Sequence, residues 1–147
     1  MTNAMPTAAP ARPMVPPLIV RLLAHPAAQP VSATSLDEFL ALPGVAVLFL
    51  WAQPVRHPEV LDVAVVLPEL VAHFAREGLA LRIGVVDEAS EHVLGLRYRM
   101  TLRPALIFVR DGAHLGTVHG MHDWQVFIER IGAVLAGASS PGGLEGR

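Results

Sequence analysis

Residues 45–59, VAVLFLWAQPVRHPE, begin as a core strand and end as a short loop. The first seven residues are continuously apolar and rich in β-branched and aromatic side chains, which is typical of a strand buried on both faces. We therefore expect Val45–Trp51 to lie in the centre of a sheet. Pro54 and Pro58 follow closely and indicate a stiff turn before the next helix.

The composition of the chain fits a single globular domain and narrows its chemistry. Its 147 residues are 52% hydrophobic, enough to fill one core. The net charge is only -2 and the basic residues form no run, which argues against a nucleic-acid or anionic-membrane partner. The absence of cysteine excludes disulfides, thiolate metal sites, thiol nucleophiles and dithiol redox chemistry.

The two ends of the chain differ in composition from its middle. Residues 1–16 are predicted to be a flexible Pro/Ala-rich arm and residues 137–147 a disordered tail, with a single domain at 17–136. The longest apolar run, Val45–Ala52, is eight residues, whereas a helix needs ~20 to cross a bilayer. The start resembles no secretory signal. We expect a cytoplasmic protein without membrane insertion.

Before the central strand the pattern predicts three short elements. Leu18–Ala24 is assigned to a helix, although its length also permits a strand. Gln29–Ser32 is predicted as an edge strand. Ser35 and Glu38 have the spacing of a capping box that opens a helix with an apolar face, and this helix is expected to end at Pro43-Gly44.

After the loop the pattern predicts a helix, a strand, a short helix, a β-hairpin and a closing helix. Two strands joined through a helix must run parallel, so the sheet is mixed. We predict a three-layer α/β/α sandwich with a central mixed β-sheet. The expected elements are a helix capped by Asp62 that ends at Gly78 with a kink at Pro68, a strand at Leu79–Val86, a short helix capped by Asp87, a hairpin of Pro104–Val109 and Leu115–His119 around Asp111-Gly112, and a last helix capped by Asp123.

This order of elements resembles the thioredoxin-like fold. A buried strand ends in Trp51-Ala52, as in thioredoxins, and Val55 and Pro58 stand where the family has its two cysteines. Pro104 matches the family's cis-proline, with Arg103 before it. The resemblance therefore implies the fold, a cis bond at Pro104 and a redox site from which both sulfurs are missing.

Two departures from thioredoxins bear on the loop. The buried acid that assists thiol chemistry in that family falls near Phe49, so its proton-transfer role is absent. Glu59 to Asp62 precede the helical pattern, which predicts that the helix N-terminus has moved away from the loop. We interpret the loop as one that has lost its redox groups and also differs in backbone structure from the thioredoxin loop.

Three segments in combination resemble the HyaE/HupG family of hydrogenase expression/formation proteins. They are Pro54–Val60, the DEASE stretch Asp87–Glu91, and Arg97–Met100 ahead of Arg103–Ala105. The resemblance implies a non-enzymatic chaperone for maturation of a NiFe uptake hydrogenase, which binds the twin-arginine signal peptide of the small-subunit precursor before export. Other hydrogenase maturation proteins are further candidate partners. The alternative is a scaffold that docks on a maturation complex without binding a signal peptide.

A thiol-free thioredoxin-like fold still offers a peptide-binding groove. We expect the backbone before Pro104 and the opposite loop to frame a groove for an extended segment, which binds by strand addition. The alternative is that Pro104 only starts a strand and Arg103 is a solvated charge. The predicted peptide-binding residues are Val55, Arg56, His57, Pro58, Glu59, Asp62, Arg103 and Pro104.

Charge complicates a cationic partner, because Arg56 and Arg103 would repel it. Acidic residues near the groove supply the counter-charge by paired hydrogen bonds with guanidinium groups. The sequence favours Glu59 and Asp62 for this role, with Glu88 and Glu91 as secondary candidates. All four are equally consistent with ordinary acids at helix starts.

No catalytic residue, metal site or cofactor is predicted. His119 and His122 form H-x-x-H across a turn, without the helical spacing or the third ligand of a zinc site. A histidine-dependent metal carrier is therefore the weakest hypothesis. No G-x-S-x-G or phosphate-binding glycine loop occurs. The hairpin edge strand permits a homodimer but does not require one.

Overall fold

The computed structural model describes residues 15–137 and places five strands in one sheet, in the order β1-β3-β2-β4-β5. The central strand β2 (Val45–Leu50) pairs parallel with β3 (Leu81–Val86) and antiparallel with β4 (Ala105–Arg110). The edges are β1 (Ala28–Val31) and β5 (Ala113–His119). The predicted mixed sheet is confirmed.

Strand β2 is buried on both faces, as its composition predicts. Val47, Phe49 and Trp51 belong to one hydrophobic cluster, whereas Ala46 and Leu48 belong to the other. This alternation follows from the two-residue period of a strand. The strand therefore joins two cores and fixes the position of the loop that follows it.

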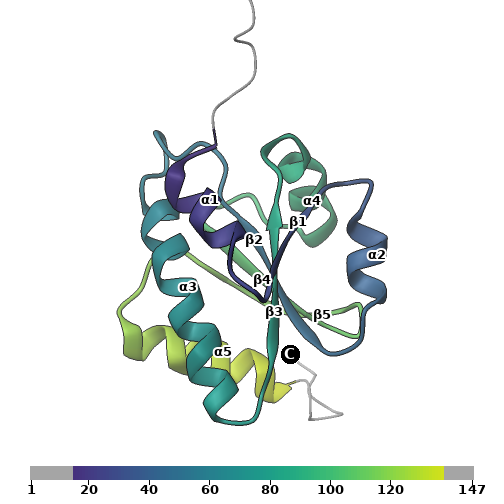
Figure 1. Ribbon diagram of the computed structural model, residues 1–147, viewed down its shortest axis with the longest axis vertical. Coiled ribbons are helices and arrows are strands. Elements are labelled where there is room, and N and C mark those ends of the chain that lie inside the picture. The colour runs from purple at the N-terminus through teal and green to yellow at the C-terminus, as the bar shows by residue number, and fades with distance from the viewer. Residues whose placement is uncertain (1–14, 138–147) are drawn as a thin grey trace, which may run out of the picture.

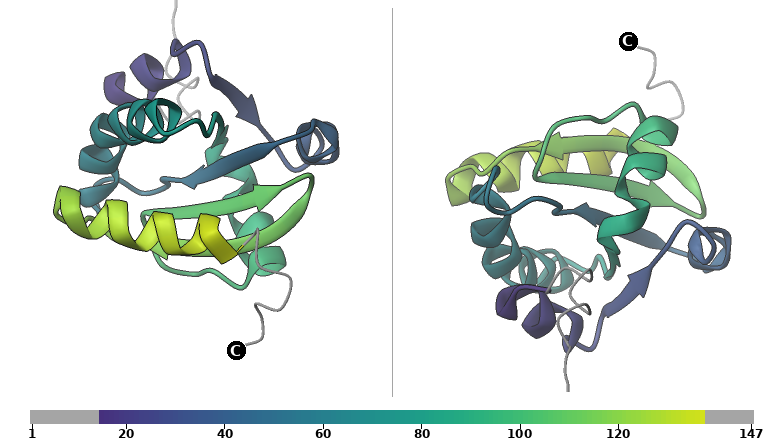
Figure 2. Two further views of the ribbon diagram at one scale, coloured as in Figure 1. Left: turned by 90° about the horizontal axis from the view of Figure 1, so that it is seen from below. Right: turned by 90° about the horizontal axis from the view of Figure 1, so that it is seen from above.

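Helices cover both faces of the sheet (Figure 1). On one face lie α1 (Pro17–Leu23), α3 (Glu59–Arg76) and α5 (Trp124–Gly137), whose apolar residues share a cluster with Phe49. On the other lie α2 (Leu36–Ala41) and α4 (Glu91–Tyr98), which follows the 3₁₀ turn η2 (Glu88–Ser90). The end-on views in Figure 2 show the sheet between these two layers. The predicted three-layer α/β/α sandwich of thioredoxin-like type is confirmed.

Helix α3 begins at Glu59, so the predicted insertion before it is wrong. Pro58 occupies the N-cap position with φ -60° and ψ -22°, and Asp62 lies in the first turn without capping the helix. Proline is favoured at helix starts because its φ is preset and its missing N–H needs no partner there. The helix N-terminus therefore lies directly at the loop, and the loop has not been separated from it.

The other turn signals have mixed outcomes. Asp87 caps the 3₁₀ turn η2 through a 2.8 Å hydrogen bond from the Ala89 N–H, whereas the short helix it was predicted to cap, α4, begins only at Glu91 after Ser90. Asp111 and Gly112 both have positive φ and form the predicted hairpin turn. The capping box at Ser35 is not formed, because its Oγ accepts a hydrogen bond from the Ser32 N–H instead.

Several boundaries move by one or two residues. Residues 17–23 are helical, which resolves the ambiguity at this segment, and β1 begins one residue before Gln29. Strand β3 starts at Leu81, β4 starts after Pro104, and α3 continues through Pro68. Residues 1–14 and 138–147, which contain most of the predicted arm and tail, lie outside the described residues. The predicted tail starts one residue too early, because Gly137 is the last residue of α5. In residues 15–137, no helix has both the length and the apolar character required for a membrane span.

The outer edge of β1 carries a proline. The carbonyls of Ala27 and Val31 accept hydrogen bonds from the N–H groups of Ile83 and Asp87, both at 2.8 Å. Since neighbouring residues of a strand alternate in direction, Pro30 turns its nitrogen away from β3. The free edge therefore lacks a donor at its third residue.

Candidate functional site

The loop after β2 is a tight turn that begins at Gln53. This residue has a φ of 59°, and its carbonyl accepts hydrogen bonds from the N–H groups of Arg56 at 3.0 Å and His57 at 2.8 Å. Val55 projects from the turn with 97% of its surface exposed. The loop thus presents an apolar side chain to solvent where the resemblance places the first thiol.

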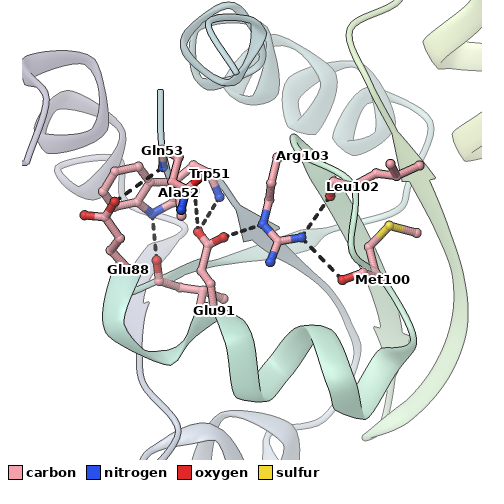
Figure 3. Close-up of polar contacts among 9 residues, drawn as sticks. Trp51, Ala52, Gln53, Glu88, Glu91, Met100, Leu102 and Arg103 are labelled. Atoms are coloured by element: carbon pink, nitrogen blue, oxygen red, sulfur yellow. Dashed lines mark hydrogen bonds and ion pairs between the residues drawn. The ribbon is translucent and has the colours of Figure 1, made fainter. Parts of the chain in front are cut away.

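A buried carboxylate ties this loop to the segment before Pro104. One oxygen of Glu91 accepts hydrogen bonds from the backbone N–H groups of Trp51, at 2.5 Å, and Ala52, at 2.7 Å. Its other oxygen accepts one from Arg103 Nε at 2.6 Å (Figure 3). We call these four residues the Glu91 bridge. Trp51 is fixed further by its Nε1, which donates to the Val86 carbonyl at 2.6 Å.

Arg103 is held on both sides of its guanidinium group. Besides its ion pair with Glu91, its Nη1 donates to the carbonyls of Leu102 at 2.9 Å and Met100 at 3.3 Å. The bond between Arg103 and Pro104 is cis, as the resemblance implies. The Arg103 side chain is therefore a bridging element of the site, in contrast to the solvated charge of the alternative interpretation.

Burial sets the ionisation of Glu91. The side chain is only 3% exposed, and this burial raises its pKa to about 7, although the hydrogen bonds from Trp51, Ala52 and Arg103 and the charge of Arg103 oppose the rise. The carboxyl group therefore changes charge near neutral pH, at the point where the loop and the segment before Pro104 meet.

Sequence reasoning did not identify Glu91 as a bridge. It placed the family's buried acid near Phe49 and treated Glu91 as a secondary ligand-binding candidate or an ordinary acid at a helix start. A usable signal existed, because Glu91, Leu94 and Tyr98 follow helical spacing and all three are buried. An acid in register with an apolar stripe indicates a buried, paired carboxylate.

A polar cavity of about 270 Å³ opens beside the Glu91 bridge. The structure brings His57, Glu88, Glu91 and Arg103 together there, from the loop, η2, α4 and the segment before Pro104. Their neighbours in the cavity wall are Ala52, Gln53, His92 and Thr101. The proposed groove between the loop and Arg103 thus coincides with a cavity lined mainly by polar groups.

The remaining predicted residues lie around this cavity. Val55 and Arg56 line an adjoining loop cavity of about 500 Å³, together with Trp51 and Glu88. Pro58, Glu59 and Asp62 are exposed, and Pro104 is buried. Among residues 15–137, these last four line neither cavity.

The histidines of the predicted H-x-x-H pair do not face each other as metal ligands. His122 Nε2 contacts the backbone carbonyl of His119 at 2.7 Å, and its ring packs against Phe127. Within the described part of the chain, no group of three or more His, Asp or Glu side chains could hold a metal ion.

Gly95 allows the chain to turn back toward Arg103, and its substitution should destabilise the protein. A Cβ at Gly95 would lie 2.7 Å from the Met100 carbonyl oxygen, which itself accepts from Arg103. We expect Gly95→Ala to lower the free energy of unfolding by about 1–3 kcal/mol. Urea unfolding measures this, with Gly132→Ala in α5 as the control.

We expect the control substitution Gly132→Ala to raise the free energy of unfolding, in contrast to Gly95→Ala. A Cβ at Gly132 meets no atom within 4 Å, so alanine should stabilise α5 by about 0.5–1 kcal/mol through the smaller entropy loss. Equal effects of the two substitutions would show that close approach at Gly95 is unimportant.

Fold and site together define a thioredoxin-like protein without cysteine, in which a buried carboxylate braces the loop against the cis-proline segment. A family model described as hydrogenase-1 expression protein HyaE matches residues 18–127. The chain belongs to this family of hydrogenase expression/formation proteins.

Its relatives carry related names. The chain is 44% identical over 124 residues to the hydrogenase expression/formation protein HoxO of Cupriavidus necator, which covers 83% of this chain and 75% of that protein. It is 42% identical over 105 residues to HupG of Bradyrhizobium diazoefficiens, with 69% of each chain covered. The crystal structure of a hydrogenase expression/formation protein HupG from Rhodopseudomonas palustris is similar, with a TM-score of 0.52, 34% identity, and coverage of 76% of this chain and 98% of that one.

Proposed function

We propose that this protein is a non-enzymatic accessory protein of hydrogenase formation. In this proposal it binds the twin-arginine signal peptide of the small-subunit precursor of a NiFe uptake hydrogenase, in the cytoplasm and before export. Family membership supports the link to hydrogenase formation. The observation that carries the peptide proposal is the polar cavity that Glu88 and Arg103 both line, together with the Arg103 backbone, which has no hydrogen-bond partner among the described residues.

The backbone at Arg103 suits the capture of an extended segment. Among residues 15–137, no hydrogen bond occupies the N–H or carbonyl of this residue. An extended peptide recognised by strand addition supplies its own N–H and carbonyl groups to such positions, and nearby side chains supply selectivity. The loop carrying His57 forms the opposite wall of the cavity.

The charges of the cavity favour a cationic partner. The guanidinium of Arg103 is already paired with Glu91, which removes much of the repulsion expected from the sequence. Glu88 accepts only a 3.3 Å hydrogen bond from the Gln53 N–H and, among the described residues, forms no ion pair. Its carboxylate can therefore receive an arginine of the ligand. We accordingly rank Glu88 ahead of Glu59 and Asp62, which line neither cavity.

Titration of the full chain with a fluorescently labelled signal peptide of the small subunit tests this proposal. We expect Glu88→Arg to weaken binding by about tenfold or more, because a charge-assisted hydrogen bond contributes ~1.5–3 kcal/mol. Glu59→Arg is the matched control, since it reverses an exposed acid outside the cavity, and should change the affinity little. No binding to the unmodified chain, or equal losses in both variants, would reject the proposed site.

A scaffold role is the second candidate, and one surface favours it. Val93, Leu96 and Leu102 are 54%, 66% and 51% exposed on α4 and the segment after it. Exposed large apolar side chains of this kind suit docking on a folded partner. A pull-down with the isolated signal peptide separates the two functions, because a scaffold of this type would retain only the folded partner.

A further inference from the structure

A second, apolar groove adjoins the cavities of the proposed site. It has a volume of about 270 Å³ and lies between α1 and the ends of β1 and β3. Val15, Ile19 and Leu23 form one wall, and Pro30 and Ala89 contribute to the other sides. The only charged side chains among the described residues that line it are Asp87 and Glu88. The groove is therefore lined mainly by apolar side chains, and its two acids follow directly after the end of β3.

Glu88 joins this groove to the site already described. It lines the polar cavity, the loop cavity and the apolar groove. Trp51 lines both the loop cavity and the groove, and its ring is fixed by the hydrogen bond from its Nε1 to the Val86 carbonyl. A single peptide segment can therefore place a cationic side chain at Glu88 and continue into the groove.

We propose that the apolar groove binds the apolar run that follows the arginine pair of the signal peptide. This inference rests on the proposed function and adds a second subsite to it. Signal peptides place a basic region directly before an apolar region of ~7–15 residues, and twin-arginine signals carry two arginines in the basic part. The order of charges on the protein, acidic at Glu88 and apolar beyond it, matches that order in the ligand.

The groove contributes through burial of apolar surface. Full burial of one Leu or Phe side chain is favourable, so loss of one such contact weakens binding about tenfold or more. An added carboxylate in the groove would also face Asp87 and Glu88 without a partner, and would leave apolar ligand atoms against a charge.

Two peptides and two variants of the full chain test the groove. One labelled peptide carries two arginines followed by ten leucine and alanine residues, and the other has this run replaced by serine and glycine. We expect the first to bind about tenfold or more tightly, and Val15→Asp to abolish this difference. Val20→Asp is the matched control. Val20 lies on α1 beside the lining residue Ile19 and is 54% exposed, but it does not line the groove.

Both substitutions change exposed positions, so folding should be retained, and thermal unfolding followed by circular dichroism checks this. Equal affinities of the two peptides for the unmodified chain, or equal effects of the two variants, would overturn the groove while leaving the site at Glu88 intact. Failure of both peptides to bind would instead reject the proposed function. A Val15-dependent dimer, or discrimination that appears only after removal of residues 1–14, would assign the groove to another occupant and overturn the proposal.

Discussion

Glu91→Ala should lower the free energy of unfolding by about 3–5 kcal/mol, the usual loss when one partner of a buried ion pair is removed. The substitution leaves Arg103, whose side chain is only 12% exposed, without its counter-charge. It also removes the acceptor of the Trp51 and Ala52 N–H groups. Because typical domains are stable by ~5–15 kcal/mol, this single change removes a large part of the total stability.

Urea unfolding at about pH 8.5, where Glu91 is mostly charged because the pH lies above its raised pKa, measures the loss, and two variants calibrate it. Glu91→Gln keeps an acceptor oxygen for the N–H groups and should lose less than Glu91→Ala. Glu88→Ala removes an acid three residues earlier whose hydrogen bond is long, at 3.3 Å, and should cost under ~1 kcal/mol. Equal urea midpoints for Glu91→Ala and Glu88→Ala would show that the Glu91 bridge does not stabilise the fold.

The stability contributed by Glu91 should fall as pH rises from about 4.5 to about 7. Burial raises the pKa of this carboxyl from 4.5 to about 7 in the folded protein. Below the pKa that Glu91 has in the unfolded chain, the carboxyl group is protonated in both the folded and the unfolded state. The contribution of Glu91 to stability is then complete. Between the two values the folded state binds more protons than the unfolded state, so the free energy of unfolding decreases with pH, by up to ~3 kcal/mol.

The difference in unfolding free energy between the natural chain and Glu91→Gln isolates this titration, because other groups are common to both. We expect the free energy of unfolding of the natural chain to decrease relative to that of Glu91→Gln as the pH rises through that interval. If the natural chain instead becomes more stable relative to Glu91→Gln as the pH rises, Arg103 and the two N–H donors outweigh desolvation and the carboxylate stays charged.

The core of the fold was predictable because its signals are local. The run Val45–Trp51 has both the length and the side chains of a central strand, and the structure buries every residue of it. The Asp111-Gly112 turn was predictable for a similar reason, since two successive positive φ values favour those residue types. These elements need no knowledge of distant contacts.

The site was less predictable because its contacts cross the chain. Glu91 meets Trp51 across 40 residues and Arg103 across 12, and composition alone cannot pair them. The start of α3 was misplaced because Asp62 resembles a cap, whereas Pro58 already begins the helix with its restricted φ. Sequence periodicity indicates which residues face a core, but it does not identify the residues with which a buried polar side chain forms hydrogen bonds or ion pairs.

Pro30 on the outer edge of β1 limits how a ligand can bind to this edge. Because one donor is missing from this edge, another strand cannot extend the sheet there with a complete set of hydrogen bonds, which disfavours edge-to-edge pairing of two copies. The same proline forms part of the groove wall. We therefore expect the proposed groove to select a ligand by the hydrophobicity of its side chains rather than by main-chain pairing, so that signal peptides of different sequence bind to the same surface.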